Sequence, residues 1–414
     1  MAKKHLIIGS GIAALSATRM IRKVNTDDEI KMVTMEDCLP YSPAVLPYLI
    51  SERIDENNIS LADENFFEKM GCSLEKAKEV VHLRTDTKEI VYRDGERDSY
   101  DTLLIASGSE PMKPPIQGLE EVGFIGCHTL ADCRNIIQKL ENKKKVTLYG
   151  AGLVSLEIAA ALLEAGYGVD IVARSRILRR YFDNEPIRII SNIFQQHGGN
   201  FYNGKEIIKV DHEGSSIKMN LADGTFLTSD LLICCLGVTP RTGFLINTDI
   251  KVNDGVLVDR NMRTNVPDVY AAGDVVESTD YFFNQPGINA IAPNAITQGR
   301  IAGANMAGEN VADRGWISMN VFKFFGHTAF SIGLPGTEGF YTLRKRGPED
   351  FKELVFKDDK LVGARFIDIE IDPGVFRYLI EGAIDVEQKE MLFDRPREVS
   401  LWLMMENEQG TRIK

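Results

Sequence analysis

The chain has 414 residues, more than one ordinary hydrophobic core holds, so we expect two or three domains. Its 44% hydrophobic and 26% charged residues are typical of a soluble globular protein. The net charge of -12 and the lack of a basic run argue against nucleic acid as a partner. No apolar stretch approaches the roughly 18 residues of a membrane span, so no membrane partner is expected.

The chain opens with an apolar strand, Leu6-Ile7-Ile8, and the glycine-rich turn Gly9-Ser10-Gly11-Ile12-Ala13-Ala14. A helix over 12–24 and a second strand over 29–35 follow. This arrangement presents backbone N–H groups and a helix dipole to a pyrophosphate. The first residues superficially resemble a signal peptide, but cleavage would destroy this strand and helix. We therefore expect a cytoplasmic protein.

A second glycine-rich turn, Gly150-Ala151-Gly152-Leu153-Val154-Ser155, follows the strand 146–149, at a distance of 141 residues from the first. A single such turn is weak evidence, because small residues also cluster at ordinary strand-to-helix turns. Two turns, each followed by a further strand on schedule, predict two dinucleotide sites.

The remaining segments suggest the domain order. Residues 38–80 are predicted to be helical and loop-like, and Pro111, Pro114 and Pro115 mark a hinge. Strands are expected over 80–92, 99–107, 206–211, 216–221 and 230–236, with a return to the first domain near 269–275. From about 315 onward, strands and helices are expected to alternate.

The predicted fold class is α/β, with two Rossmann-like dinucleotide-binding domains, the second inserted in the first, and a C-terminal α+β interface domain. The expected limits are 1–112 and 240–314 for the first domain, 113–239 for the second, and 315–414 for the C-terminal domain.

No metal site is expected from the cysteines and histidines. The six cysteines include no C-x-x-C pair and no zinc or iron–sulfur spacing, and the six histidines are scattered. Cys234 and Cys235 lie in an apolar run, where small buried side chains are the simpler interpretation and a vicinal disulfide the alternative.

Five motifs together resemble the FAD-dependent pyridine nucleotide–disulfide oxidoreductase superfamily: Gly9-x-Gly11, Ser107-Gly108, Gly150-x-Gly152, Leu236-Gly237 and Ala271-Ala272-Gly273-Asp274. The resemblance covers residues 1 to about 310 firmly and the last hundred loosely. It implies FAD at the first fingerprint, NAD or NADP at the second, and no catalytic residue beyond the flavin itself.

Three features would hold FAD in such a fold. Asp274 would hydrogen-bond the ribityl chain, and a helix beginning at Asn294 would direct its N-terminus at the flavin pyrimidine. Glu36, 25 residues after Gly11, would accept the ribose hydroxyls. The alternatives are a helix cap for Asp274 and a solvated strand-end charge for Glu36. The residues expected at FAD are Gly9, Gly11, Ile12, Ala13, Ala14, Glu36, Val80, Ser107, Gly108, Gly273, Asp274, Asn294 and Ala295.

The nicotinamide is left open between NAD and NADP. Ala173 stands where an NADH site has Asp or Glu, and Arg174 and Arg176 are suited to a 2′-phosphate. Arg179 and Arg180 follow, so a solvated basic segment is nearly as good an interpretation, and the resemblance to complex subunits described below favours NAD. The residues expected at this site are Gly150, Gly152, Leu153, Val154, Ser155, Glu157, Ala173, Arg174 and Gly237.

The chain departs from the superfamily at the redox cysteines. Ala44 occupies the single-cysteine position, and Cys38 lies six residues early, on the other side of Pro40 and Pro43. The acid–base His…Glu pair is not recognisable, and His327 is the only late histidine. Thiol relay chemistry therefore lacks its nucleophile.

This pattern resembles the branch without cysteines: rubredoxin and ferredoxin reductases, and the flavin subunits of phenylglyoxylate dehydrogenase and tungsten aldehyde oxidoreductase complexes. It predicts an enzyme passing electrons between NAD(P)H and an iron–sulfur protein or subunit. The alternatives are a self-contained NAD(P)H oxidase and a non-catalytic nicotinamide-sensing flavoprotein. Apolar residues at 322–325 and 401–405 predict either a packed core or a C-terminal surface for a partner or an oligomer.

Overall fold

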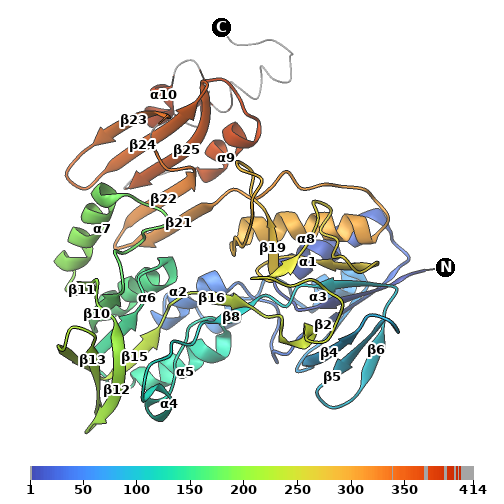
Figure 1. The fold of residues 1–414 in the computed structure, drawn as a ribbon, viewed down its shortest axis with the longest axis horizontal. Helices are drawn as coiled ribbons and strands as arrows, with labels where there is room; N and C mark the ends of the chain where they lie inside the picture. The colour runs from blue at the N-terminus through green and yellow to red at the C-terminus, as the bar shows by residue number, and fades with distance from the viewer. Residues whose placement is uncertain are drawn as a thin grey trace. The chain divides into compact units, whose positions relative to one another are not determined.

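The computed structural model describes residues 2–337, 339–367, 372–386, 389–395, 398–399 and 401. Two compact units emerge from the contacts within the chain (Figure 1). The first comprises residues 1–112, 126–134 and 237–317, and the second comprises 113–125, 135–236 and 318–414. Each fingerprint lies in a different unit. No helix in the described ranges is both long enough and apolar enough to cross a membrane.

A five-stranded parallel sheet forms the centre of the first unit. Its order is β18 (Val269–Ala271), β7 (Thr102–Ile105), β1 (Lys4–Ile8), β2 (Glu29–Val33) and β3 (Cys72–Glu75). Its central strands are almost wholly apolar because both faces are covered. The sheet confirms the expected return of the chain near residue 269. The strand predicted over 29–35 ends at Val33, two residues before the expected limit, and the chain bends from Met35 onward.

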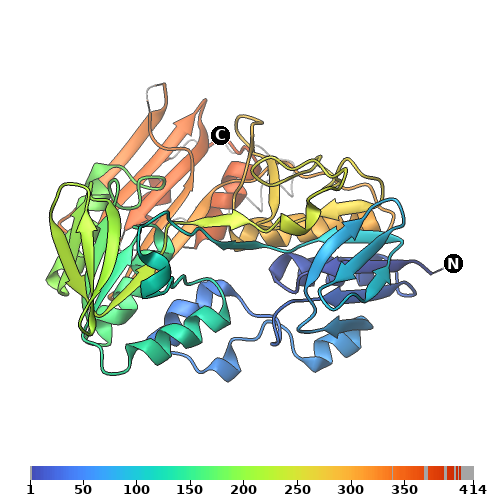
Figure 2. The same cartoon turned by 60° about the horizontal axis from the view of Figure 1, so that its bottom comes forward.

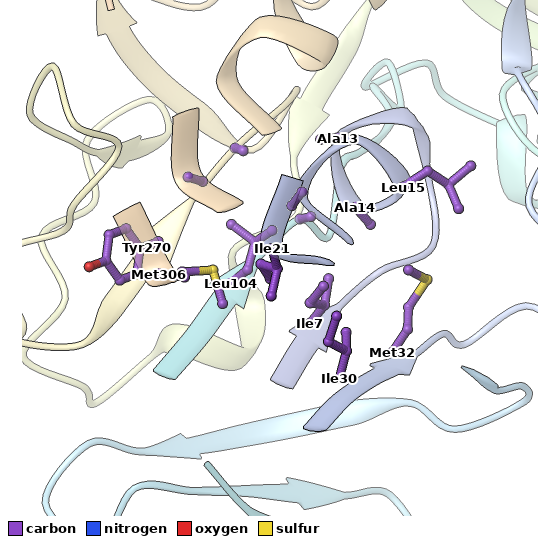
Figure 3. Packing of buried hydrophobic residues seen from close by; sticks show 14 of the residues in the cluster. Ile7, Ala13, Ala14, Leu15, Ile21, Ile30, Met32, Leu104, Tyr270 and Met306 are labelled. Carbon is purple, nitrogen blue, oxygen red and sulfur yellow. The ribbon is translucent and has the colours of Figure 1, made fainter. Parts of the chain in front are cut away.

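Successive residues of β1 point into two different hydrophobic clusters, one on each face of the sheet. Ile7 points into a cluster with α1 (Ile12–Val24) and α8 (Ala292–Met306), shown in Figure 3. Leu6 and Ile8 point into a cluster on the other face, which includes side chains of β4 (Val80–Arg84) and β5 (Glu89–Tyr92). Together with β6 (Arg97–Ser99), β4 and β5 form an antiparallel sheet. This alternation follows from the two-residue period of a strand.

Helices α1 and α8 pack closely because small residues face each other. A Cβ added at Gly299 or Gly303 of α8 would overlap the backbone oxygen of Ala13 or Ala17 of α1. Ala13, Ala14 and Ala17 are themselves buried in this cluster. The close contact fixes the position of α1, and with it the turn that precedes the helix.

The remaining elements of the first unit are short. They are α2 (Leu46–Ile50), α3 (Glu64–Met70), β17 (Val256–Leu257), β19 (Val276–Thr279) and β20 (Pro286–Gly287). Residues 38–80, predicted to be helical and loop-like, also contain strand β3. Its pairing with β2 is what identifies it as a strand.

The second unit repeats the parallel plan. Its sheet has the order β11 (Gly199–Asn203), β10 (Gly168–Ala173), β9 (Lys145–Tyr149) and β15 (Leu231–Cys234). Helices α6 (Leu153–Glu164) and α7 (Asn184–Gln196) belong to it. Strands β12 (Ile207–Glu213), β13 (Ser216–Leu221) and β14 (Phe226–Ser229) form an antiparallel sheet, visible in yellow-green in Figure 2. Helix α4 (Leu119–Val122) also belongs to the second unit, and the boundary between the units falls within α5 (Leu130–Leu140).

The chain leaves and re-enters the first unit along two paired strands. Strand β8 (Ser109–Pro111) pairs antiparallel with β16 (Val238–Pro240), and Met112 N–H donates to Gly237 O at 3.0 Å. The two ends of the intervening segment are therefore neighbours, as an inserted domain requires.

The C-terminal segment is an antiparallel sheet followed by helices. The sheet order is β21 (Met319–Phe324), β22 (His327–Gly333), β25 (Lys360–Ile367), β24 (Phe351–Lys357) and β23 (Tyr341–Arg346). Helices α9 (Pro373–Glu381) and α10 (Met391–Asp394) follow. The expected alternation of strands and helices is therefore wrong. Five strands in succession form one sheet, and the helices come only after them.

The late phenylalanines pack inside the chain. Phe322 and Phe324 are buried, and Phe324 stacks on Phe194 of α7 with ring centroids 5.6 Å apart. Phe325 stacks on His197 at 3.9 Å. Core packing accounts for all three. Of the apolar run 401–405, only Leu401 is described, and it is exposed; residues 402–405 lie outside the described residues.

We predict that Gly303→Ala destabilises the first unit. The added methyl group would overlap Ala17 O, so α1 and α8 must separate, at a cost of about 1–3 kcal/mol. Thermal unfolding of the FAD-free protein measures this as a lower Tm. Gly243→Ala is the matched control, because its Cβ meets open space. Equal Tm values for the two variants would contradict the proposed close packing.

Candidate functional site

Both fingerprint turns are built in the same way. Gly9 N–H donates to Val33 O, and Gly150 N–H donates to Val172 O, each at 2.8 Å. Gly9 and Gly150 have φ angles of +104° and +121°, which L side chains rarely adopt. A Cβ at either position would also overlap a backbone oxygen of the neighbouring strand end. Glycine is therefore required at both positions, for the same two reasons.

Three helices begin without a side-chain cap. Helix α1 follows Gly11, α6 follows Gly152 and α8 follows Ile291, and no side chain of these cap residues bonds to the first turn. Space is open beside Gly11 and Gly152, where a Cβ would meet nothing within 4 Å. The unpaired N–H groups of a first turn carry the positive end of the helix dipole.

The other long helices are capped. Asp63, Asp183 and Asp372 accept backbone N–H groups at the starts of α3, α7 and α9. At α5, Thr129 and Asp132 bond reciprocally. Among described helices of seven or more residues, the uncapped ones are therefore those of the two fingerprints and of the return segment. Their free donors fit anionic groups such as the pyrophosphate of a dinucleotide.

Glu36 lies three residues beyond β2, not at its end, and is half-buried. Its Oε2 accepts the Tyr41 hydroxyl at 2.7 Å, and that hydroxyl accepts Leu130 N–H at 2.7 Å. Burial, together with the bond to Glu36, raises the pKa of Tyr41, so the phenol stays a donor. In the described structure no protein group bonds to Oε1, which leaves it available to a ligand. Tyr41 belongs to the Tyr-Ser-Pro stretch, but nothing in the sequence connects it to Glu36.

Asp274 lies between Gly273 and β19. Ser109 Oγ donates to its Oδ2 at 3.1 Å, and His128 Nε2 lies 3.4 Å from the same hydroxyl. Burial raises the pKa of Asp274, against the opposing effects of Ser109 and His128. The chain continues into a strand, so a helix-capping role has no helix to serve. Sequence reasoning missed Ser109 and His128, because their positions depend on tertiary contacts.

The other residues expected at FAD fall into three groups. Ala13, Ala14 and Ala295 are buried where α1 packs against α8. Their small side chains allow the two helices to pack closely (Figure 3). Ile12 and Val80 are partly buried against the two faces of the sheet. The rest make or permit backbone contacts: Ser107 Oγ donates to Arg241 O at 2.9 Å, Gly108 is open, Gly273 N–H donates to Gln298 Oε1 at 2.9 Å, and Asn294 Nδ2 donates to Asn289 O at 2.9 Å.

The second fingerprint exposes an apolar side chain beside its free donors. Val154 is 47% exposed, Leu153 is half-buried, and buried Ser155 donates to Gly150 O at 2.7 Å. Burial raises the pKa of Glu157 to about 7, so its charge changes near neutrality. Gly237, also expected at this site, belongs to the first unit.

Strand β10 ends at Ala173, which is 5% exposed. The next segment carries the exposed side chains of Arg174, Arg176, Arg179 and Arg180. No acidic side chain occupies the end of this strand.

Cys38 is a poor nucleophile. Burial, and then the neighbouring Glu36 carboxylate, raises the pKa of its thiol to about 11. Ala44 lies in a short turn of 3₁₀ helix, Pro43–Val45. All six cysteines are free, so Cys234 and Cys235 form no vicinal disulfide. Neither position 38 nor position 44 therefore offers a reactive thiol.

Two glycine turns before uncapped helices on parallel sheets, with no reactive thiol at position 38 or 44, are typical of an oxidoreductase that binds a nicotinamide and a flavin dinucleotide. Residues 3–299 match the model of the pyridine nucleotide-disulphide oxidoreductase family. The NADH-dependent phenylglyoxylate dehydrogenase subunit epsilon of Aromatoleum evansii is 34% identical over 386 residues, or 91% of each chain. The chain belongs to this family: it is an NAD(P)H-dependent flavoprotein oxidoreductase, and FAD is the family's typical cofactor.

Solved structures share the fold. A ferredoxin reductase from Rhodopseudomonas palustris covers 96% of this chain and 100% of its own, with a TM-score of 0.87 at 22% identity. An engineered water-forming NADPH oxidase covers 92% of this chain and 90% of its own, with a TM-score of 0.84 at 23% identity. It is a variant of the NADH oxidase of Lactobacillus brevis. Its substitutions include three consecutive ones, Asp to Ala, Ala to Arg and Met to Ser, and a change of Pro to Arg five residues later.

We predict that Glu36→Ala purifies with substoichiometric FAD. The change removes an acceptor of charge-assisted hydrogen bonds, each worth about 1.5–3 kcal/mol. The ratio of flavin absorbance to protein measures the effect. Glu29→Ala, an exposed carboxylate on β2, is the control and should keep full FAD. Tightly retained, stoichiometric FAD in the Glu36 variant would show that the carboxylate does not hold the cofactor.

Proposed function

We propose that this protein passes electrons between NAD(P)H and an iron–sulfur protein or subunit through FAD, as a component of a multi-subunit oxidoreductase. The observation that carries the proposal is the pair of dinucleotide-type turns without a reactive thiol at position 38 or 44. The relative from Aromatoleum evansii is by name a dehydrogenase subunit, which supports the same assignment.

In this proposal, FAD lies at the first fingerprint. The free N–H groups of α1 bind its pyrophosphate, and Glu36, held by Tyr41, accepts the ribose hydroxyls. Asp274 accepts from the ribityl chain, while Ser109 positions its carboxylate. The uncapped start of α8 stabilises negative charge placed before it. Bound FAD supplies the exchange of a hydride on one side and of single electrons on the other.

NAD(P) is proposed to lie at the second fingerprint. The free donors of α6 bind the pyrophosphate, and Val154 packs against the nucleotide. Glu157, with its pKa near 7, is suited to hydrogen-bond the nicotinamide carboxamide in either protonation state. No side chain is assigned a covalent role.

Turnover with an artificial electron acceptor tests this function. The FAD-loaded protein should reduce ferricyanide rapidly with NAD(P)H and consume O₂ slowly. Rapid peroxide formation without another acceptor would identify an oxidase instead. No turnover with any acceptor would identify a nicotinamide-sensing flavoprotein. Isolation from the native host should recover an iron–sulfur subunit in fixed ratio.

We further predict that the protein takes up one pair of electrons per FAD. Cys38 is protonated at neutral pH and Ala44 carries no sulfur, so no thiol stores a second pair. Anaerobic dithionite titration followed by absorbance measures the stoichiometry, and no thiolate-to-flavin charge-transfer band should appear. Cys38→Ser should titrate identically. A second pair of electrons that this substitution abolishes would overturn the assignment.

A further inference from the structure

Given the proposed function, we infer that the second dinucleotide site takes NADPH in preference to NADH, and that Arg174 and Arg180 bind its 2′-phosphate beside Ala173. The inference concerns the adenosine end of the nucleotide. It rests on the end of β10, on the segment that follows, and on the charges around them.

The end of β10 carries a small side chain and no repelling charge. An NADH site places a carboxylate here, which binds the ribose 2′-OH and repels a 2′-phosphate. Ala173 offers a methyl group instead, and its backbone oxygen is already bonded to Lys205 N–H at 3.0 Å. The strand end therefore permits a phosphate but supplies no partner for a hydroxyl.

The arginine-bearing segment is fixed beside the fingerprint. Leu178 N–H donates to Ala151 O, within the glycine turn, at 2.9 Å. Ile177 and Leu178 are buried, which anchors the middle of the segment and turns its flanking residues outward. Arg174 and Arg180 are exposed on either side of this anchor. The basic side chains thus lie on a segment that is hydrogen-bonded to the glycine turn, and not on a detached surface loop.

The charges near the segment leave these arginines available. Arg176 donates to Asn184 Oδ1 at 2.6 Å, but Arg174, Arg179 and Arg180 have no hydrogen bond or ion pair to any described residue. Two acids that follow are engaged elsewhere: Asp183 with Arg344 at 3.1 Å, and Glu185 with Arg346 at 3.2 Å.

A further acid, Glu206, is near these arginines. Burial raises the pKa of Tyr149, the nearby Glu206 carboxylate adds to this rise, and Arg174 opposes it. Glu206 offsets at most one of the four arginines, so the local charge stays positive. Guanidinium groups are well matched to phosphate oxygens, which accept bidentate hydrogen bonds.

The engineered NADPH oxidase carries the same residues at the same spacing. Its substitutions create the sequence Ala-Arg-Ser, with an arginine five residues after the serine. This chain reads Ala173-Arg174-Ser175, followed five residues later by Arg180. A substitution to Ala in the oxidase lies 18 residues before its new Ala, just as Ser155 lies 18 residues before Ala173. The parent of that enzyme is an NADH oxidase.

Equilibrium binding and turnover together test the inference. With the FAD-loaded protein, calorimetry should give a Kd for NADP⁺ at least about tenfold below that for NAD⁺. Arg174→Ala and Arg180→Ala should each weaken NADP⁺ about tenfold or more, because each removes a charge-assisted bond to phosphate, and change NAD⁺ less than about threefold. Ala173→Glu should reverse the preference. The kcat/KM values with ferricyanide should follow the same order.

Arg188→Ala, an exposed arginine on α7, is the charge-matched control and should leave both nucleotides unchanged. Tighter binding of NAD⁺ by the unaltered protein would overturn the inference, as would equal weakening of both nucleotides by the arginine substitutions. In those cases NADH still reduces the flavin, so the proposed function survives. Binding of neither nucleotide would overturn both.

Discussion

Unpaired N–H groups at the starts of three helices are the constraint on which the rest of this structure depends. A helix start that is neither capped nor hydrated is costly, and side chains cap the other helices of seven or more residues in the described part of the chain. At α1, α6 and α8 the cap is left out, and glycine turns or Ile291 precede the helix instead. An anionic ligand at these helix starts would accept their free N–H groups, and binding to the folded chain alone would stabilise the fold.

The two fingerprints share one feature, the glycine turn, and differ in another, the residues around the end of the second strand. In both turns the first glycine donates the same hydrogen bond to the neighbouring strand, a geometry suited to a pyrophosphate. They differ around the end of the second strand, where Glu36 lies three residues beyond β2 and Ala173 is the last residue of β10. Nucleotide choice therefore depends on a few side chains beyond the strand, and can change while the turn stays constant.

Sequence reasoning succeeded where the chemistry is local. Glycines with positive φ and the strands before them are fixed by neighbouring residues, so both turns and the return to the first sheet near Val269 were predictable. Strand β3 was not, because its identity comes from pairing with β2. Tyr41, Ser109 and His128 were missed because their partners are set by the folded chain: Tyr41 bonds to Glu36, Ser109 to Asp274, and His128 lies against the Ser109 hydroxyl. In the C-terminal segment, hairpin pairing overrode the apparent alternation of strands and helices.

The inserted arrangement also determines the order in which the chain can fold during synthesis. The face of α1 that packs on α8 has no partner until the ribosome has added residues 292–306, and β7 lacks its neighbour β18 until residue 271. At 5–20 residues per second, that delay is on the order of tens of seconds. The sheet of the inserted segment, β9 to β15, is complete well before then. The first fingerprint, although made first, is therefore the second of the two to acquire its mature shape, and the buried face of α1 stays exposed on the nascent chain until then.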